Sequence, residues 1–245
     1  MGGRIRAGIG GWVFEPWRGA FYPAGLRQKD ELSYVGQHLT ATEINATYYS
    51  SQKPATFAGW AAAVPDGFQF AVKASRYCTN RRVLADGGES VRKFVEQGIV
   101  ELGDRLGPIL WQFMPTKAFD PDDFGAFLQL LPASVGGVPL RHALEVRHAS
   151  FDDPAFLAMA RDAGAAVVMA DHPTYPRIEG HDVGFRYLRL MQGREEEPTG
   201  YSSSELDAWA ERMRDWAQGG DVFAFFISGA KVRNPAAAMA LIGRL

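Results

Sequence analysis

HALEVRH, residues 142–148, places two charged side chains at the end of an otherwise apolar run. Successive side chains of a β-strand point to opposite faces, so Glu145 and Arg147 share one face while Leu144 and Val146 share the other. The apolar face suits packing against helices, which leaves the charged pair facing the interior of the fold. Burying unpaired charge is costly, so these residues must pair, bind a ligand or line a cavity.

Seven further runs are also apolar, rich in β-forming residues, and mostly bounded by glycine, proline or aspartate. They are RIRAGIGG (4–11), TATEINAT (40–47), FQFAVKAS (68–75), GPILWQF (107–113), AAVVMAD (165–171), FRYLRLM (185–191) and VFAFFIS (222–228). Amphipathic helical patterns separate most of the runs, and such alternation predicts a parallel sheet. Eight units in 245 residues predict an α/β fold, a single (β/α)₈ TIM-type barrel forming one domain over residues 1–245.

Helix start signals support this interpretation. Asp120-Pro121 and Asp153-Pro154 each combine an N-cap with a first-turn proline. Ser202 and Glu205 have capping-box spacing, and Asn234-Pro235 opens the last helical pattern. The sixth unit is expected to be irregular, because its connection, HPTYPRIEGHDVG (172–184), has no convincing helical pattern.

Polar side chains recur at the downstream ends of these runs, which a parallel barrel gathers at one mouth, where such barrels carry their active sites. The predicted catalytic residues are Glu43, Lys73, Glu145 and Asp171. The predicted substrate-binding residues are Trp12, Asn45, Tyr48, Arg147, His148 and Arg189. Tyr187 shares its face with Arg189 in the same way. The alternative interpretation is a structural ion-pair network that closes the top of the barrel.

The cations favour an anionic ligand over a metal ion. Lys73, Arg147 and Arg189 could hold a phosphate or carboxylate, with arginine supplying bidentate geometry. Arg76, Arg81 and Arg82 extend the positive charge along the chain. The candidate metal ligands are Glu43, Glu145, Asp171, His148 and His172, but there is no HExxH motif or cysteine pair, and the cations would repel a metal. No metal ligand is therefore assigned; a divalent metal is the less favoured alternative, and no cofactor is identified.

Aromatic residues and glycines surround the same predicted mouth. Trp12 and either Tyr48 or Tyr49 are expected to stack on a sugar ring or base, whereas the other aromatics of the first loop are expected to pack. Gly8, Gly10 and Gly11 do not complete GxGxxG, because Val13 occupies the sixth position. We interpret them as glycines that let the backbone turn at the mouth.

The bulk properties restrict the class of protein. The net charge is −2, the pI is about 6.2, and Cys78 is the single cysteine, which favours a reducing compartment. No signal-peptide pattern or apolar stretch of the ~18 residues needed to span a bilayer occurs. A cytoplasmic protein without a membrane partner is expected. Its expected partner is a small-molecule or nucleotide anion, with nucleic acid as an alternative, and the oligomeric state is not predicted.

Several motifs together resemble the YecE-like family, also called domain of unknown function 72. They are GIGGWVFEPWRGAFYP (8–23), TEINATYY (42–49), FAVKASRYCTNRRVL (70–84), LGPILWQFMP (106–115), LEVRHASF (144–151), YLRL (187–190) and the helical pattern around Trp209. The resemblance implies a (β/α) barrel with a polar pocket at its C-terminal face, similar in fold to endonuclease IV and sugar isomerases. It implies no established activity.

Two positions depart from the family pattern. Ile227-Ser228 stand where the family usually has two asparagines, and Thr79-Asn80 where it often has Thr-His. These departures raise the question of whether the family's activity is retained.

Three hypotheses of function follow. The first is an enzyme or ligand-binding barrel for a phosphate-bearing nucleotide, nucleic acid or sugar phosphate, leaning towards hydrolysis of phosphoesters. The second is a metal-dependent sugar isomerase or epimerase. The third is a non-catalytic binding module or scaffold.

Overall fold

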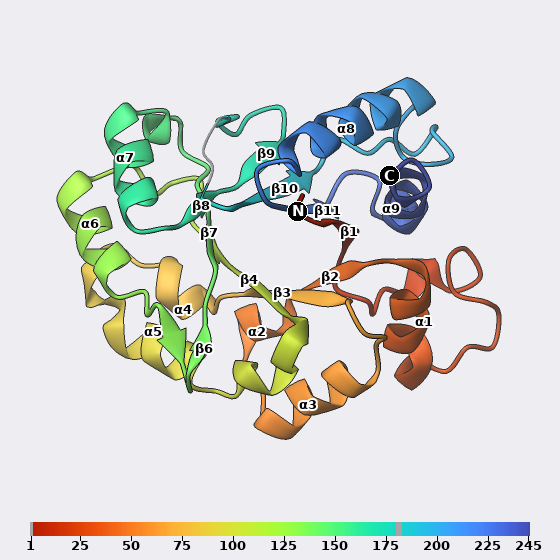
Figure 1. Ribbon diagram of the computed structural model, residues 1–245, viewed down its shortest axis with the longest axis horizontal. Helices are drawn as coiled ribbons and strands as arrows, with labels where there is room; N and C mark the ends of the chain where they lie inside the picture. The colour runs from red at the N-terminus through yellow and green to blue at the C-terminus, as the bar shows by residue number, and fades with distance from the viewer. Residues whose placement is uncertain (1, 180–182) are drawn as a thin grey trace.

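The computed structural model describes residues 2–179 and 183–245 and places a parallel sheet at the centre of the molecule (Figure 1). The sheet contains β1 (Ile5–Gly10), β2 (Ala41–Ile44), β3 (Gln69–Lys73), β4 (Leu106–Gln112), β7 (His142–Glu145), β8 (Ala166–Val167), β9 (Met169–Asp171), β10 (Phe185–Leu190) and β11 (Asp221–Phe226). Their order is β8-β7-β4-β3-β2-β1-β11-β10-β9. Each predicted strand run contains part of this sheet, and the predicted α/β barrel is confirmed.

The sheet closes almost completely through the sixth predicted strand. That strand is split at Val168 into β8, which pairs with β7, and β9, which pairs with β10. The Val168 amide still donates to the Leu144 carbonyl at 2.9 Å. The two ends of the sheet are therefore successive pieces of the same chain segment, and the carboxyl ends of the strands face one mouth.

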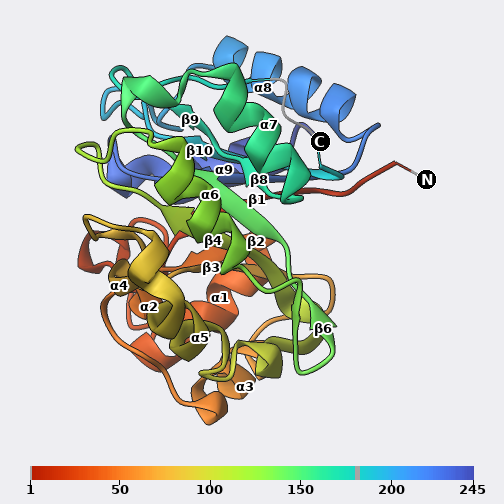
Figure 2. The same ribbon diagram turned by 90° about the vertical axis from the view of Figure 1, so that its left-hand side faces the viewer.

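Helices surround the sheet (Figures 1 and 2). They are α1 (Glu31–His38), α2 (Ala46–Tyr49), α3 (Pro54–Ala62), α4 (Arg76–Thr79), α5 (Gly88–Val95), α6 (Pro121–Gln129), α7 (Pro154–Asp162), α8 (Ser203–Trp216) and α9 (Asn234–Ile242). Short 3₁₀ segments are η1 (Glu15–Trp17), η2 (Gln28–Asp30), η3 (Ala85–Gly87), η4 (Ile99–Arg105), η5 (Ala149–Phe151) and η6 (Lys231–Arg233). None of the described helices is long and apolar enough to cross a bilayer.

The predicted helix starts are confirmed. The Asp120 and Asp153 side chains cap α6 and α7, each followed by the first-turn proline. Ser202 and Glu205 form the capping box of α8, and Asn234 is the first residue of α9. The irregular sixth unit is also confirmed over the described residues 172–179 and 183–184, which contain no helix; residues 180–182 of that prediction lie outside the described part.

One small element was not predicted. Strands β5 (Ser134–Val135) and β6 (Val138–Pro139) form an antiparallel hairpin between α6 and β7. The turn at its tip uses Gly136 and Gly137, both with positive φ. The hairpin lies outside the barrel sheet and does not contribute to the mouth.

Small residues and aromatic rings fill the middle of the barrel. Ala41, Ala71, Tyr187, Phe223 and Phe225 belong to this buried interior cluster. Gly8 of β1 belongs to the same closely packed region, because a Cβ there would lie 1.8 Å from the carbonyl oxygen of Ala41. Gly8 therefore permits the close approach of β1 and β2, whereas Gly11, with φ of +72°, makes the turn predicted at the mouth.

A polar cluster closes the opposite end of the barrel, where the strands begin. Asp221 Oδ2 accepts from Arg6 and Arg141, each at 3.1 Å, and Arg141 also donates to Gln69 Oε1 at 2.8 Å. The Arg4 amide donates to the other Asp221 oxygen at 2.8 Å. The interior is thus bounded by charged groups at both ends.

Candidate functional site

Arg189 of β10 lies at the centre of the charged mouth. Its Nη1 donates to Glu145 Oε2 at 2.6 Å, and its Nη2 donates to Glu43 Oε1 at 2.9 Å. Both carboxylates are fully buried, and Arg189 is 2% exposed. One guanidinium therefore balances two acids contributed by β2 and β7.

The remaining carboxylate oxygens also accept hydrogen bonds. The Tyr187 hydroxyl donates to Glu43 Oε2 at 2.8 Å, and Arg147 Nε donates to Glu145 Oε1 at 2.9 Å. Burial acts in the opposite direction, but Arg189 and Arg147 hold the pKa of Glu145 below its ordinary value. Burial and then Glu43 raise the pKa of Tyr187 well above its ordinary value. All four carboxylate oxygens thus have donors, an arrangement compatible with the structural ion-pair interpretation.

Gln112 of β4 joins this network from another strand. Its Oε1 accepts from Arg147 Nη2 at 2.9 Å and from Arg189 Nη1 at 3.2 Å. This amide oxygen fixes the two guanidinium groups beside each other without adding charge.

Lys73, the last residue of β3, differs from the two arginines because it has no ion-pair partner in the described part of the chain. It is 9% exposed, and no carboxylate in the described part of the chain lies within 4.0 Å of its Nζ. The Nζ instead lies 4.2 Å from the centroid of the Tyr48 ring. Burial and Arg189 lower the pKa of Lys73 to about 8, against the attraction of Glu43 and Glu145.

A cavity of about 780 Å³ opens above these residues at the carboxyl ends of the strands. Its lining includes Gly10, Gly11, Trp12, Asn45, Tyr48, Tyr49, Trp60, Lys73, Gln112, Arg147, Arg189, Ile227, Ser228, Lys231 and Asn234. Lys231 adds a further cation, with its Nζ 4.0 Å from the centroid of the Phe14 ring. Burial lowers the pKa of Lys231. The cavity thus combines cations on several sides with aromatic rings.

Most of the predicted site residues meet here. Trp12, Asn45, Tyr48, Lys73, Arg147 and Arg189 line the cavity. Glu43 and Glu145 are bound to Arg189 and do not line the cavity. Their assignment as catalytic residues stays a prediction.

Besides Glu43 and Glu145, two further predicted residues, Asp171 and His148, do not line this cavity. Asp171 Oδ1 accepts from Gln192 Nε2 at 2.8 Å, and His148 Nδ1 lies 2.8 Å from Ser150 Oγ while capping η5. His172 stacks on Tyr175 with ring centroids 3.8 Å apart. Asp171 ends β9 and shares the face of Met169, which packs outside the barrel beside Trp216, so strand alternation points Asp171 away from the cavity. His148 follows β7, and there the local cap of η5 decides where the side chain points.

The arginines that follow β3 in the sequence do not line the main cavity, unlike Lys73. Arg81 and Arg82 line a separate open cavity of about 600 Å³, together with Lys117, and Arg76 is exposed. Lys117 in turn pairs with Asp123 at 2.6 Å. The predicted extension of positive charge therefore lies beside the main cavity rather than in it.

Sequence reasoning missed Gln112, Trp60 and Lys231 as lining residues, and the hydrogen bond of Tyr187 to Glu43. Gln112 ends an apolar strand like the chosen residues, so that same signal identifies it. Tyr187 shares a face with Arg189. Trp60 on α3 and Lys231 after β11 carry no comparable pattern.

The donor set does not fit a metal ion. Within residues 2–179 and 183–245, no group of three His, Cys, Asp or Glu side chains is arranged to hold one. Glu43 and Glu145 are both committed to Arg189, so a cation would have to displace that guanidinium.

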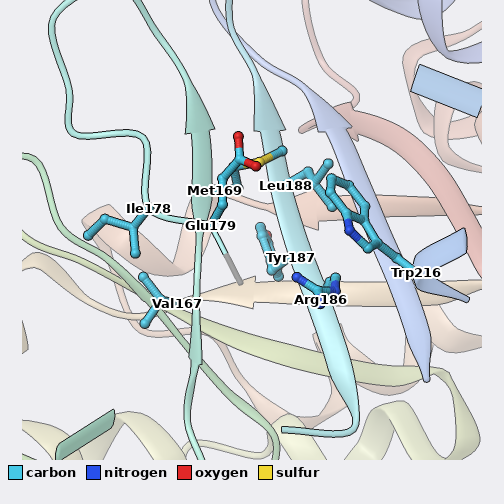
Figure 3. Close-up of a pocket in the computed structure, with 8 residues that line it drawn as sticks. All are labelled: Val167, Met169, Ile178, Glu179, Arg186, Tyr187, Leu188 and Trp216. Carbon is cyan, nitrogen blue, oxygen red and sulfur yellow. The ribbon is translucent and has the colours of Figure 1, made fainter. Parts of the chain in front are cut away.

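A smaller cavity lies away from the mouth and is lined by Val167, Met169 and Leu188, among others (Figure 3). It lies between β8, β9 and β10 and the Trp216 ring of α8, and it measures about 20 Å³. That volume holds about one water molecule, so this cavity is a packing gap rather than a ligand site.

Comparison with known proteins agrees with the barrel fold. The chain is 23% identical to "UPF0759 protein YunF" of Bacillus subtilis, covering 91% of this chain and 88% of that protein. The crystal structure of a DUF72 family protein from Thermotoga maritima has a TM-score of 0.75 and 23% identity, covering 98% and 97% of the two chains. One from Enterococcus faecalis has a TM-score of 0.74 and 19% identity, covering 99% and 98%.

The family match extends over nearly the whole barrel. Residues 6–245 match the family described as "Protein of unknown function DUF72", which spans every barrel strand except the first residue of β1. It also agrees with the resemblance that the strand-end motifs indicated. The chain therefore belongs to the DUF72 family.

Proposed function

We propose that the cavity binds a small organic phosphate, such as a nucleotide or sugar phosphate. The observation that carries the proposal is Lys73, a buried cation at the cavity wall with no described carboxylate within 4.0 Å. Arg147 and Arg189 line the same cavity. An anion placed among them would supply the negative charge that Lys73 lacks.

The local charges support an anion rather than a cation as the ligand. Glu43 and Glu145 contribute two negative charges, whereas Lys73, Arg147 and Arg189 contribute three positive charges. Lys231 increases the surplus at the cavity wall. A desolvated surplus of positive charge is costly without a partner, and a phosphate oxygen is a strong acceptor for both arginine and lysine.

The aromatic residues support an organic part on the ligand. Trp12 and Trp60 pack edge to face with centroids 5.3 Å apart, and both line the cavity. Tyr49 is 64% exposed at the same wall. Rings of this kind stack on sugar rings and bases, and about 780 Å³ is within the usual range for a small-molecule site.

Hydrolysis of a phosphoester has weaker support than binding. A general base must be free to accept a proton from water, but every oxygen of Glu43 and Glu145 already accepts a hydrogen bond from a protein donor. The same engagement weakens the metal-dependent isomerase or epimerase alternative, because those carboxylates would be its natural ligands. A binding module without turnover is compatible with the same cavity, so binding is the property to test first.

The test compares phosphorylated and unphosphorylated partners in thermal-shift and calorimetric measurements. Adenosine monophosphate is paired with adenosine, and glucose 6-phosphate with glucose. Lys73→Met is compared with Lys29→Met, which removes the same charge at an exposed site. We expect the phosphorylated member of at least one pair to stabilise the wild type and Lys29→Met. Lys73→Met should bind about tenfold or more weakly. Equal binding by both variants, or stabilisation by no phosphate compound, would contradict the proposal.

A further inference from the structure

Lys73 differs from the other lysines of the chain in its surroundings. The six lysines are Lys29, Lys53, Lys73, Lys93, Lys117 and Lys231. Lys93 and Lys117 each lie 2.6 Å from a carboxylate, and Lys29 and Lys53 are exposed. Lys231 also lines the cavity and is partly desolvated, but it is more exposed than Lys73. Lys73 alone among them is buried, and it still reaches a cavity large enough for a ligand.

These surroundings suit an amine that must lose its proton in order to react. A carboxylate beside the Nζ would hold the ammonium form, and in the described part of the chain none lies within 4.0 Å. Burial removes water from the charge, and Arg189 and, less strongly, Arg147 repel it, which together outweigh the attraction of Glu43 and Glu145. With a pKa of about 8, roughly one molecule in ten carries the neutral amine at pH 7.

We propose that Lys73 Nζ is a nucleophile that forms a Schiff base with the carbonyl carbon of a phosphate-bearing aldehyde or ketone. The phosphate part of this proposal rests on the proposed function. Lysine amines desolvated in this way are suited to attack carbonyl substrates. The arginines and Lys231 would hold the phosphate while the carbonyl group lies at Lys73.

The covalent step is balanced without any further reagent. The nitrogen lone pair attacks the carbonyl carbon, and a proton moves to the oxygen to give a carbinolamine. Loss of water then forms the C=N bond, with the carbonyl oxygen and two hydrogens originally on nitrogen leaving as that water. Protonation of the imine restores a positive charge, which the Tyr48 ring face, 4.2 Å from Nζ in the free protein, can stabilise.

The experiment traps the imine by reduction. The full chain is incubated with dihydroxyacetone phosphate, glyceraldehyde 3-phosphate or, as a partner lacking phosphate, glyceraldehyde. Sodium borohydride is then added, and the modified residue is located by peptide mass spectrometry. Lys73→Arg keeps the positive charge but cannot form the imine, and Lys29→Arg is the matched control. Phosphate binding by each variant is measured in parallel.

The expected result is one adduct per chain at Lys73, formed at least tenfold more with a phosphorylated probe than with glyceraldehyde. It should be absent in Lys73→Arg, present in Lys29→Arg, and suppressed by excess inorganic phosphate. Adducts spread evenly over the lysines, or no adduct at Lys73 with any probe, would overturn the proposal.

The parallel binding measurement separates the two proposals. Phosphate binding that persists in Lys73→Arg without any adduct in the wild type would leave the proposed function intact and reject the nucleophile. An adduct at Lys73 that forms equally well with glyceraldehyde, in a protein that binds no phosphate compound, would support the nucleophile and reject the phosphate site. Absence of both binding and adduct would reject both.

Discussion

Arg189 Nη1 lies 2.6 Å from Glu145 Oε2 in the barrel interior, where the guanidinium also binds Glu43 at 2.9 Å. The charges come from strands far apart in sequence and are almost completely removed from water. Such an arrangement stabilises the fold only while every partner is present. Removing one partner leaves the opposite charge buried without compensation for its lost hydration. Arg189 therefore has a structural role as well as lining the cavity.

Replacing Arg189 by methionine should strongly destabilise the protein. The substitution leaves Glu43 and Glu145 buried without their shared cation, a change that typically costs about 3–5 kcal/mol. Urea unfolding followed by circular dichroism measures the free energy of unfolding. Arg92→Met, which removes an exposed i,i+4 ion pair with Glu96, should cost no more than about 0.5 kcal/mol. Similar losses in both variants would show that the Arg189 network contributes no special stability.

Tyr187→Phe tests the same network through a neutral group. The variant keeps the ring but removes the hydroxyl that donates to Glu43 Oε2 at 2.8 Å. A buried carboxylate oxygen without its donor should cost about 1–3 kcal/mol of unfolding free energy. Because Tyr187 does not line the main cavity, phosphate affinity should change less than twofold in calorimetry. A variant as stable as the wild type would contradict the assigned hydrogen bond.

The strand ends show how far sequence periodicity reaches. The shared face of Glu145 and Arg147 was predictable because side chains alternate along a strand. The bonds from Arg189 to both acids were not, because they depend on which strands face each other across a closed barrel. Asp171 and His148 also end or follow strands, yet hydrogen bonds to Gln192 and Ser150 hold them outside the main cavity. The outward face of Asp171 follows from its alternation with Val168 on the opposite face, whereas the local cap formed by His148 leaves no periodic signal.

The polar cluster at the end of the barrel where the strands begin was not predicted, for a related reason. Arg6, Arg141 and Asp221 lie near the upstream ends of β1, β7 and β11, whereas the predicted site residues lie at the downstream ends of their strands. Closing a barrel brings together both ends of its strands. Barrel closure therefore produces a second cluster of charged residues where the strands begin, as well as the cluster at the mouth.

The lowered pKa of Lys73 should be visible in the pH dependence of the free energy of unfolding. Its folded-state pKa of about 8 is below the ordinary value of 10.5, so the unfolded chain binds more protons between these values. Stability contributed by this group is therefore lowest below pH 8, rises with pH through that interval, and levels off above 10.5. Urea unfolding of wild type and Lys73→Met across this interval should show the wild type gaining about 3 kcal/mol relative to the variant. Parallel pH profiles would contradict the lowered pKa of Lys73.

Asp221→Asn should separate stability from ligand binding. Asp221 accepts from Arg6, Arg141 and the Arg4 amide at the end of the barrel opposite the main cavity. Asparagine keeps the shape but removes the negative charge between two arginines whose pKa values are already lowered by burial. Because the aspartate is partly exposed to solvent, the expected loss of unfolding free energy is about 1–3 kcal/mol, less than for Arg189→Met. Binding of a phosphate compound at a temperature well below unfolding should stay within twofold of the wild type, since no residue of this cluster lines the main cavity. A large loss of affinity in a folded Asp221→Asn protein would mean that the two ends of the barrel are energetically coupled.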